Sequence, residues 1–144
     1  MLVVDDERAL RRMASRMLER MGVTSEDLDD GKHCETVLRQ RGQIPSMGDL
    51  PLDTKISRGA EVGGMREREG EGEGKGGRIG RKFDAILMDI VMVHSRGTDV
   101  CKHLLDLGCR VPIFAMTANH DAWMLPSYRE AGFYGLLPKP YSSK

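Results

Sequence analysis

The stretch FDAILMDIVM, residues 83–92, decides the fold predicted for this chain. It begins with a run, residues 83–88, that is apolar except for Asp84 and leads directly into Asp89. Two other runs have the same form: residues 2–4 lead into Asp5 and Asp6, and residues 111–116 lead into Thr117. Consecutive apolar positions of this length are typical of strands buried on both faces. We therefore predict three buried strands, each followed by a polar residue.

Helical patterns separate these strands. Residues 10–21 carry apolar side chains three and four positions apart and end at Gly22, which predicts an amphipathic helix. Shorter helices are predicted at 33–41, 98–107 and 120–131, the last disturbed by Pro126, and weaker strands at 23–28 and 134–137. Alternating strands and helices indicate an α/β fold with a parallel sheet covered on both faces. Ligands of such sheets bind beyond the carboxyl ends of the strands.

Residues 42–80 differ in composition from the rest of the chain. They hold eleven of its seventeen glycines and the run EGEGKGG at 71–77. Their few apolar residues cannot bury enough surface to offset the entropy of ordering, so we predict a flexible insertion within a single domain spanning 1–144. The pair Gly74-Lys75 is no phosphate-binding P-loop, because neither Ser nor Thr follows the lysine.

The bulk composition excludes several classes of function. Lys plus Arg and Asp plus Glu both number 22, so no net charge attracts nucleic acid, and none is expected as a partner. The three cysteines lack metal-ligand or disulfide spacing and are predicted as small core residues in a reducing, intracellular compartment. The four histidines have no carboxylate partner at a fixed spacing and are predicted as surface or capping residues. No apolar stretch is long enough for a membrane span.

Five polar residues follow the predicted strands: Asp5, Asp6, Asp89, Thr117 and Lys139. In a parallel sheet they would meet at one edge. Three carboxylates in one pocket repel each other and need a cation, and oxygen ligands with room for water suit Mg²⁺. A carboxylate can also attack phosphorus, while a lysine and a metal ion neutralise the charge of the transferred group. The edge thus predicts phosphoryl chemistry.

Four segments resemble the signature segments of response-regulator receiver domains, in the order of that family: LVVDDE, FDAILMDIVM, VPIFAMTAN and GLLPKPY. The resemblance covers nearly everything outside residues 42–80. It implies a flavodoxin-like, doubly wound parallel sheet of five strands in the order 2-1-3-4-5. It also implies a domain of a two-component phosphorelay that is switched by phosphorylation.

The resemblance implies a role for each residue at the strand ends. Asp89 is the expected phosphoacceptor, Thr117 the switch hydroxyl, and Lys139 the lysine that contacts the phosphoryl group. Asp5 and Asp6 form the expected acidic pair, with Asp6 a direct Mg²⁺ ligand and Asp5 acting through water. The expected metal ligands are Asp5, Asp6, Asp89 and the backbone carbonyl of Val91.

Four features depart from the family pattern. Val93 replaces the proline that usually follows the methionine of the DxxMP segment, and Leu136 replaces the aromatic residue three positions before the lysine. The chain stops at Lys144, where the family adds a last helix, so part of one sheet face is expected to be uncovered, exposing an apolar patch. The insertion falls between the second helix and the third strand, at the edge opposite the predicted site, and is expected to spare it.

The leading hypothesis is a phosphoacceptor receiver of a His-to-Asp relay, either free-standing or part of a hybrid histidine kinase. Its partner would be a histidine kinase or a histidine phosphotransfer protein, and its only chemistry would be its own phosphorylation and dephosphorylation. The alternative is a pseudo-receiver, a protein-binding module that does not switch. A phosphatase with an Asp nucleophile is disfavoured, because Val91 stands where that chemistry wants a second acid.

Overall fold

The computed structural model of the chain describes residues 1–45, 80–119, 121 and 126–140. Its sheet has five strands, all paired in parallel, in the order β2-β1-β3-β4-β5. This is the flavodoxin-like order expected from the resemblance. The strands are β1 (Leu2–Val4), β2 (Glu26–Leu28), β3 (Ile86–Asp89), β4 (Ile113–Thr117) and β5 (Gly135–Pro138).

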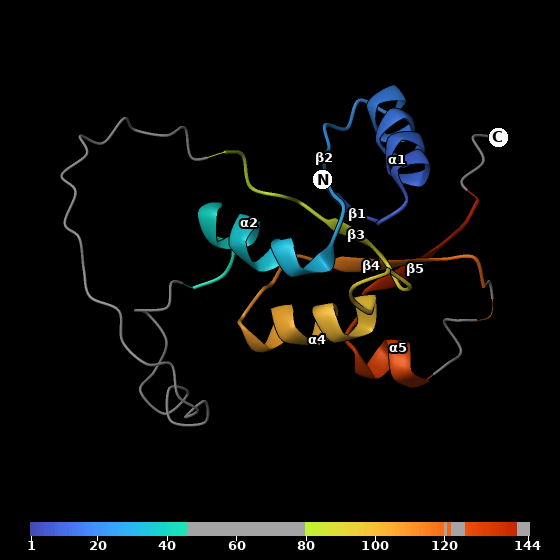
Figure 1. Cartoon of the computed structure of the whole chain (residues 1–144). Coiled ribbons are helices and arrows are strands. Elements are labelled where there is room, and N and C mark those ends of the chain that lie inside the picture. The colour runs from blue at the N-terminus through green and yellow to red at the C-terminus, as the bar shows by residue number, and fades with distance from the viewer. Residues whose placement is uncertain (46–79, 120, 122–125, 141–144) are drawn as a thin grey trace, which may run out of the picture.

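Helices lie on both faces of the sheet (Figure 1). The helix α1 (Arg8–Arg20) packs on one face, where Val3, Leu87 and Met116 form a small core with its Ala14. The opposite face carries the larger core, which continues into the other helices. These are the 3-10 turn η1 (Gly31–His33), α2 (Cys34–Gln40), α4 (Gly97–Asp106) and α5 (Pro126–Glu130).

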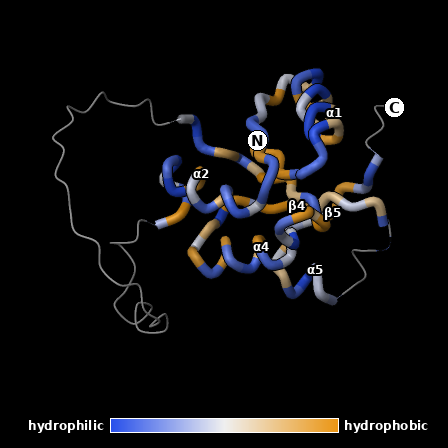
Figure 2. Tube along the Cα trace, in the orientation of Figure 1, coloured by the Kyte–Doolittle hydropathy of each residue, from blue (hydrophilic) through white to orange (hydrophobic). Residues whose placement is uncertain are grey.

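The two cores follow from the alternation of side chains along each strand. In β3, Ile86 and Met88 belong to the larger core and Leu87 to the smaller one. Figure 2 shows hydrophobic residues along the central strands and mostly hydrophilic residues along α1. Burial on both faces explains why β3 and β4 lack the alternating pattern of a half-exposed strand.

Several boundaries differ from the predictions. The strand predicted from residue 83 begins at Ile86, and the short α5 begins at Pro126. Pro suits the first turn of a helix, where its missing N–H has no partner to lose. The helix predicted from residue 120 falls partly outside the described residues, since 120 and 122–125 are not among them.

The first residues of the predicted insertion belong to the packed body. Ile44 is buried in the larger core. The Gln43 side chain exchanges two hydrogen bonds with the backbone of Phe83, at 2.7 and 2.8 Å, and so joins the two sides of the insertion. The predicted flexibility of the remainder concerns residues 46–79, which lie outside the described part of the chain.

One sheet face carries an apolar groove. Its volume is about 600 Å³, and one wall is formed by Met17 and Leu18 of α1 and by Met21, which follows the helix. Phe114 and Leu137 belong to the sheet side of the groove. Among the described residues, α1 is the helix that packs on this face, and none after β5 forms a helix. The apolar patch expected from the sequence is therefore present. None of the described helices is long and apolar enough to cross a membrane.

Candidate functional site

The predicted site residues meet at the carboxyl edge of the sheet. Asp5 and Asp6 follow β1, Asp89 ends β3 and Thr117 ends β4. Lys139 follows β5. The parallel register explains the convergence: Val4 pairs with Met88, Asp89 with Met116, and Thr117 with Pro138. All the strand-end residues singled out in the sequence are thus neighbours in space.

The three aspartates form one cluster. One carboxylate oxygen from each of Asp5, Asp6 and Asp89 lies within 4.8 Å of the others. Asp5 and Asp89 are buried, at 1% and 7% exposure, whereas Asp6 is partly exposed. Repulsion between carboxylates this close disfavours the fully ionised cluster unless a cation is present. The cluster therefore has the donor atoms and the charge that a hard divalent cation prefers.

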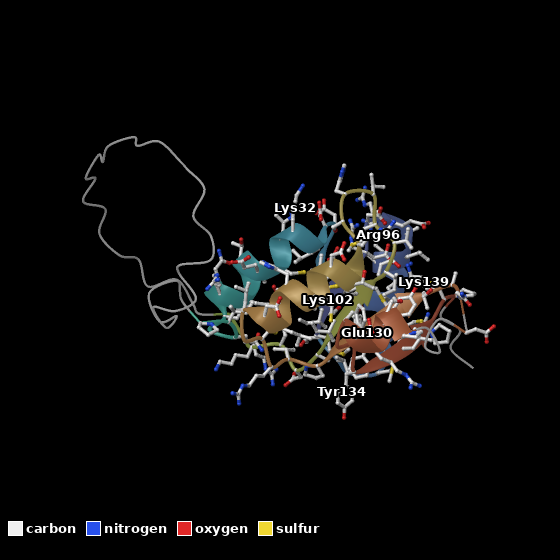
Figure 3. The ribbon with its side chains drawn as sticks, turned by 90° about the horizontal axis from the view of Figure 1, so that it is seen from below. Lys32, Arg96, Lys102, Glu130, Tyr134 and Lys139 are labelled. Atoms are coloured by element: carbon white, nitrogen blue, oxygen red, sulfur yellow. The ribbon has the colours of Figure 1, made fainter. Side chains whose placement is uncertain are left out.

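Lys139 lies between two of these carboxylates. Its Nζ is 2.6 Å from Asp5 Oδ2 and 3.0 Å from Asp89 Oδ1. Figure 3 shows Lys139 on the segment that follows β5. Its backbone N–H donates to the carbonyl of Thr117 at 2.7 Å, which fixes the start of this segment beside β4. One ammonium group thus pairs with two of the three carboxylates, so the cluster keeps a net negative charge that a further cation can neutralise.

Burial perturbs the acid–base behaviour of this pair. Burial raises the pKa of the Asp89 carboxyl above its ordinary value; the hydrogen bond and charge of Lys139 oppose this shift, and the charge of Asp5 adds to it. Burial lowers the pKa of Lys139, but its hydrogen bonds to Asp5 and Asp89 outweigh burial, so the net pKa is raised. Lys139 therefore remains a cation, and the carboxylate of Asp89 is less strongly solvated than a surface aspartate.

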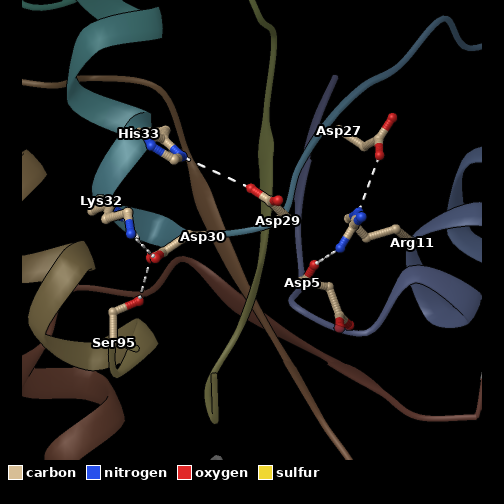
Figure 4. A network of polar contacts seen from close by, with 8 residues as sticks. All are labelled: Asp5, Arg11, Asp27, Asp29, Asp30, Lys32, His33 and Ser95. Atoms are coloured by element: carbon tan, nitrogen blue, oxygen red, sulfur yellow. Dashed lines mark hydrogen bonds and ion pairs between the residues drawn. The ribbon is translucent and has the colours of Figure 1, made fainter. Parts of the chain in front are cut away.

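The Asp5 carboxylate is held on both oxygens. Its Oδ1 accepts the backbone N–H of Glu7 at 2.8 Å, and its Oδ2 accepts from Lys139. The Asp5 carbonyl accepts a hydrogen bond from Arg11, which also pairs with Asp27 (Figure 4). These contacts lock the turn between β1 and α1. With both oxygens already engaged, Asp5 suits the indirect, water-mediated role that the resemblance implies.

The loop between β3 and α4 carries Val91, whose carbonyl is an expected metal ligand. An isolated antiparallel bridge joins Val91 to Arg96 across this loop. Gly97 closes it, because a Cβ at this position would lie 2.2 Å from the Asp89 carbonyl oxygen. The Val93 N–H donates to Asp6 Oδ2 at 2.7 Å. The loop is therefore tied to the turn after β1.

A second contact holds this loop from the other side. Ser95 Oγ donates to Asp30 Oδ1 at 3.1 Å, and the same oxygen accepts the backbone N–H of Lys32 at 3.0 Å (Figure 4). That backbone hydrogen bond is the largest cause that lowers the pKa of the buried Asp30 to about 2. Neither Asp30 nor Ser95 is among the site residues predicted from the sequence. An Asp before a short helix is a recognisable N-cap signal, but its contact with Ser95 has no local signature.

Two other expectations concern residues away from the site. Cys34, Cys101 and Cys109 are free and buried, as predicted, and burial raises the pKa of Cys34 to about 12. His103, predicted as a surface or capping residue, is partly exposed, and its Nε2 is 2.7 Å from Glu35 Oε2. This pair joins α4 to α2 and could not be read from spacing, because the two residues are far apart in sequence.

The residues present fit a magnesium ion. Three carboxylates of mixed burial supply hard oxygen donors, and the partly exposed Asp6 leaves room for water ligands. Among the described residues this is the only group of three or more acidic, histidine or cysteine side chains close enough to share an ion.

Comparisons with known proteins agree with this geometry. Residues 78–144 match the family model of the response regulator receiver domain. Response regulator MprA of Mycolicibacterium vanbaalenii is 25% identical over 141 residues, which cover 98% of this chain and 44% of that protein. The chain thus spans less than half the length of this relative.

Solved structures show the same fold. Chemotaxis protein CheY4 of Vibrio cholerae has a TM-score of 0.62 and 20% identity, covering 98% of this chain and 86% of that one. A mutant receiver domain of the histidine kinase CKI1 from Arabidopsis thaliana has a TM-score of 0.61 and 22% identity, covering 95% and 78%. Residues 78–144 thus match the response regulator receiver family, and together with residues 1–45 they form the five-stranded parallel sheet that the solved receiver structures share.

Proposed function

We propose that this chain is the phosphoacceptor of a His-to-Asp phosphorelay and that Asp89 takes the phosphoryl group in a Mg²⁺-dependent reaction. The observation that carries the proposal is the cluster of Asp5, Asp6 and Asp89 with Lys139 between two of its carboxylates. A bound Mg²⁺, held by Asp6, Asp89 and the Val91 carbonyl with Asp5 acting through water, would neutralise charge on the phosphoryl oxygens.

The remaining chemistry belongs to the residues of the chain. A carboxylate oxygen of Asp89 forms a bond to phosphorus while the bond from phosphorus to the donor's imidazole nitrogen breaks, and the nitrogen keeps that electron pair. Lys139, already 3.0 Å from Asp89 Oδ1, neutralises charge on the transferred group. The hydroxyl of Thr117, at the end of the adjacent strand, donates to a phosphoryl oxygen. Val91 stands two residues after Asp89 and supplies no acid for rapid hydrolysis.

The signalling role follows from this chemistry. The donor would be a histidine kinase or a histidine phosphotransfer protein, and phosphorylation would shift the population of loop and helix conformations that a partner recognises. We propose an intracellular location, which the three free thiols support. The neutral composition gives no reason to expect a nucleic acid partner for this domain.

Phosphorylation with a small-molecule donor tests the proposal. The purified chain is incubated with Mg²⁺ and acetyl phosphate, and intact mass is read for the parent and for Asp89→Asn, which keeps the size of the side chain. We expect one phosphoryl group on the parent, none on the variant, and none on the parent when Mg²⁺ is chelated. A folded parent that stays unlabelled would instead favour the pseudo-receiver, and persistent labelling of the variant would refute Asp89 as the acceptor.

A further inference from the structure

The backbone N–H of Val93 makes a direct contact with the acidic cluster. It donates to Asp6 Oδ2 at 2.7 Å, between two loops whose residues are 87 positions apart. This length is at the short end of the range for an N–H that donates to a carboxylate, where charge strengthens the bond. The side chain of Val93 takes no part, since the residue is 79% exposed.

This contact depends on one departure from the family pattern. The receiver segment that residues 83–92 resemble usually continues with proline, and Val93 stands in that place. Proline has no backbone N–H, so a proline at this position could not make the bond. The hydrogen bond to Asp6 is therefore a consequence of the residue type at position 93 in this chain.

The hydrogen bond from Val93 occupies one carboxylate oxygen of Asp6 and leaves the other available to a metal ion. Asp6 Oδ2 is taken by Val93, while Asp6 Oδ1 receives no hydrogen bond from any residue that the structure describes. Asp5, by contrast, has both oxygens engaged, by Glu7 and Lys139. Within the cluster, Asp6 thus combines a fixed orientation with a spare oxygen, which is the arrangement that a direct metal ligand needs.

The loop that carries Val93 is held independently at its far end. Ser95 is bonded to the buried Asp30, and the Met92 N–H donates to the Ser95 carbonyl at 3.3 Å. Asp6 is therefore attached to a loop that is anchored at the end of β2, as well as to its own strand β1. Such a loop can hold a carboxylate in place more firmly than a freely moving one.

We propose that the Val93 N–H is a positioning group for magnesium: it fixes the Asp6 carboxylate for the metal and ties metal binding to the loop between β3 and α4. The inference rests on the proposed Mg²⁺ site. It adds to that site a backbone donor in the outer sphere of the metal, on the loop whose Val91 carbonyl is an expected ligand. Val91 and Val93 are both exposed, so metal binding would change the conformation of a loop that is accessible to a protein partner.

The test compares two substitutions at this position. Val93→Pro removes the N–H, and Val93→Ala keeps it while shortening the same exposed side chain. Mg²⁺ is titrated into each protein without any phosphoryl donor, and the Kd is read by calorimetry. We expect Val93→Pro to weaken binding by on the order of tenfold, in the range found when the outer-sphere partner of a metal ligand is lost. The Kd of Val93→Ala should equal that of the parent.

Two further measurements keep the outcome decisive. Unfolding by urea in chelator reports metal-free stability, since a merely structural bond would lower the stability of Val93→Pro and leave its Kd unchanged. Replacing the Val93 amide by an ester removes the N–H without the ring, which covers the case in which the proline variant does not fold. Equal Kd values for the ester and the parent would overturn the inference. A parent that binds no Mg²⁺ would instead overturn the proposed function.

Discussion

At the scale of single residues, the site holds three carboxylates and one lysine, so its negative charges outnumber its positive charge. Lys139 contacts the carboxylates of Asp5 and Asp89, and Asp6 lies beyond it at the partly exposed side of the cluster. Burial raises the pKa of Asp89, which means that the folded protein pays in free energy to ionise this carboxyl. The cluster is therefore a source of instability that a divalent cation can relieve.

This argument predicts that Asp89→Asn stabilises the metal-free protein at neutral pH. The native pKa of Asp89 lies above the ordinary value of 3.8, so the folded state binds more protons than the unfolded state between these two values. The free energy of unfolding of the parent should then fall as pH rises through that window, whereas the variant lacks this pH dependence because Asn does not ionise. Urea unfolding of both proteins in chelator, from pH 3.5 to 7, measures the difference.

The difference in free energy of unfolding between Asp89→Asn and the parent should follow the titration of Asp89. It should be smallest at the acid end, grow as the pH rises, and become constant above the native pKa. Excess Mg²⁺ should stabilise the parent and reduce the gap, because the variant has lost one proposed ligand. A variant less stable than the parent at neutral pH without metal would contradict the raised pKa.

Much of the site could be predicted because it depends on a local rule. Asp5, Asp6, Asp89, Thr117 and Lys139 each follow or end a strand, and parallel strands bring their carboxyl ends together. The bonds that hold the site in place escaped prediction. The hydrogen bond from Val93 to Asp6 joins residues 87 positions apart, and the one from Ser95 to Asp30 joins residues 65 positions apart. The first uses a backbone N–H, which every residue type except proline has.

At the scale of elements, the junction of β3 and α4 is the tightest point near the site. A Cβ on Gly97 would lie 2.2 Å from the carbonyl oxygen of Asp89 and 3.0 Å from the backbone of Ile90. Gly97 also donates its N–H to the Ile90 carbonyl at 2.9 Å. The helix can therefore begin this close to the strand only because residue 97 has no side chain.

We accordingly predict that Gly97→Ala destabilises the protein by on the order of 1–3 kcal/mol, as overpacking against fixed backbone usually does. The midpoint of urea unfolding measures the loss, and Thr98→Ala, one residue further along the same helix, serves as the control and should change it little. Labelling of Asp89 should also slow in the Gly97 variant, because the strand end must move. Unchanged stability would mean that α4 can shift away without cost.

The elements differ in how well the sequence predicted them. β3 and β4 are buried, and their apolar runs placed them correctly to within a few residues. β2 is short, and Glu26 and Asp27 are exposed, so it shows almost no apolar signal and gains its place from pairing with β1. α5 is likewise free of buried residues, which explains why periodicity could not define its limits.

At the scale of the whole molecule, the two faces of the sheet are unequally covered. The larger core is shared with α2 and α4, whereas the opposite face combines α1 with the apolar groove of about 600 Å³. The sequence predicted this asymmetry through the resemblance, because composition and periodicity alone do not say which helix covers which face. Met21, at 74% exposure, belongs to the lining of the groove.

The groove predicts measurable binding of an apolar fluorescent dye by the folded chain. Met21→Lys places a charge at its edge and should reduce dye fluorescence while leaving the urea midpoint unchanged, since Met21 is largely exposed already. Val91→Lys removes an equally exposed apolar side chain, 78% exposed and outside the groove, and should leave dye binding as it is. Equal losses in the two variants would show that the dye does not report on the groove.

The spread of the site residues along the sequence has a consequence for the chain as it is synthesised. Asp5 and Asp6 follow the first strand, whereas Asp89 ends the third, so the acidic cluster cannot form until β3 has been made. Lys139, which balances two of these charges, emerges last of all. The acidic cluster and the lysine between its carboxylates can therefore assemble only after β5 and Lys139 have been translated.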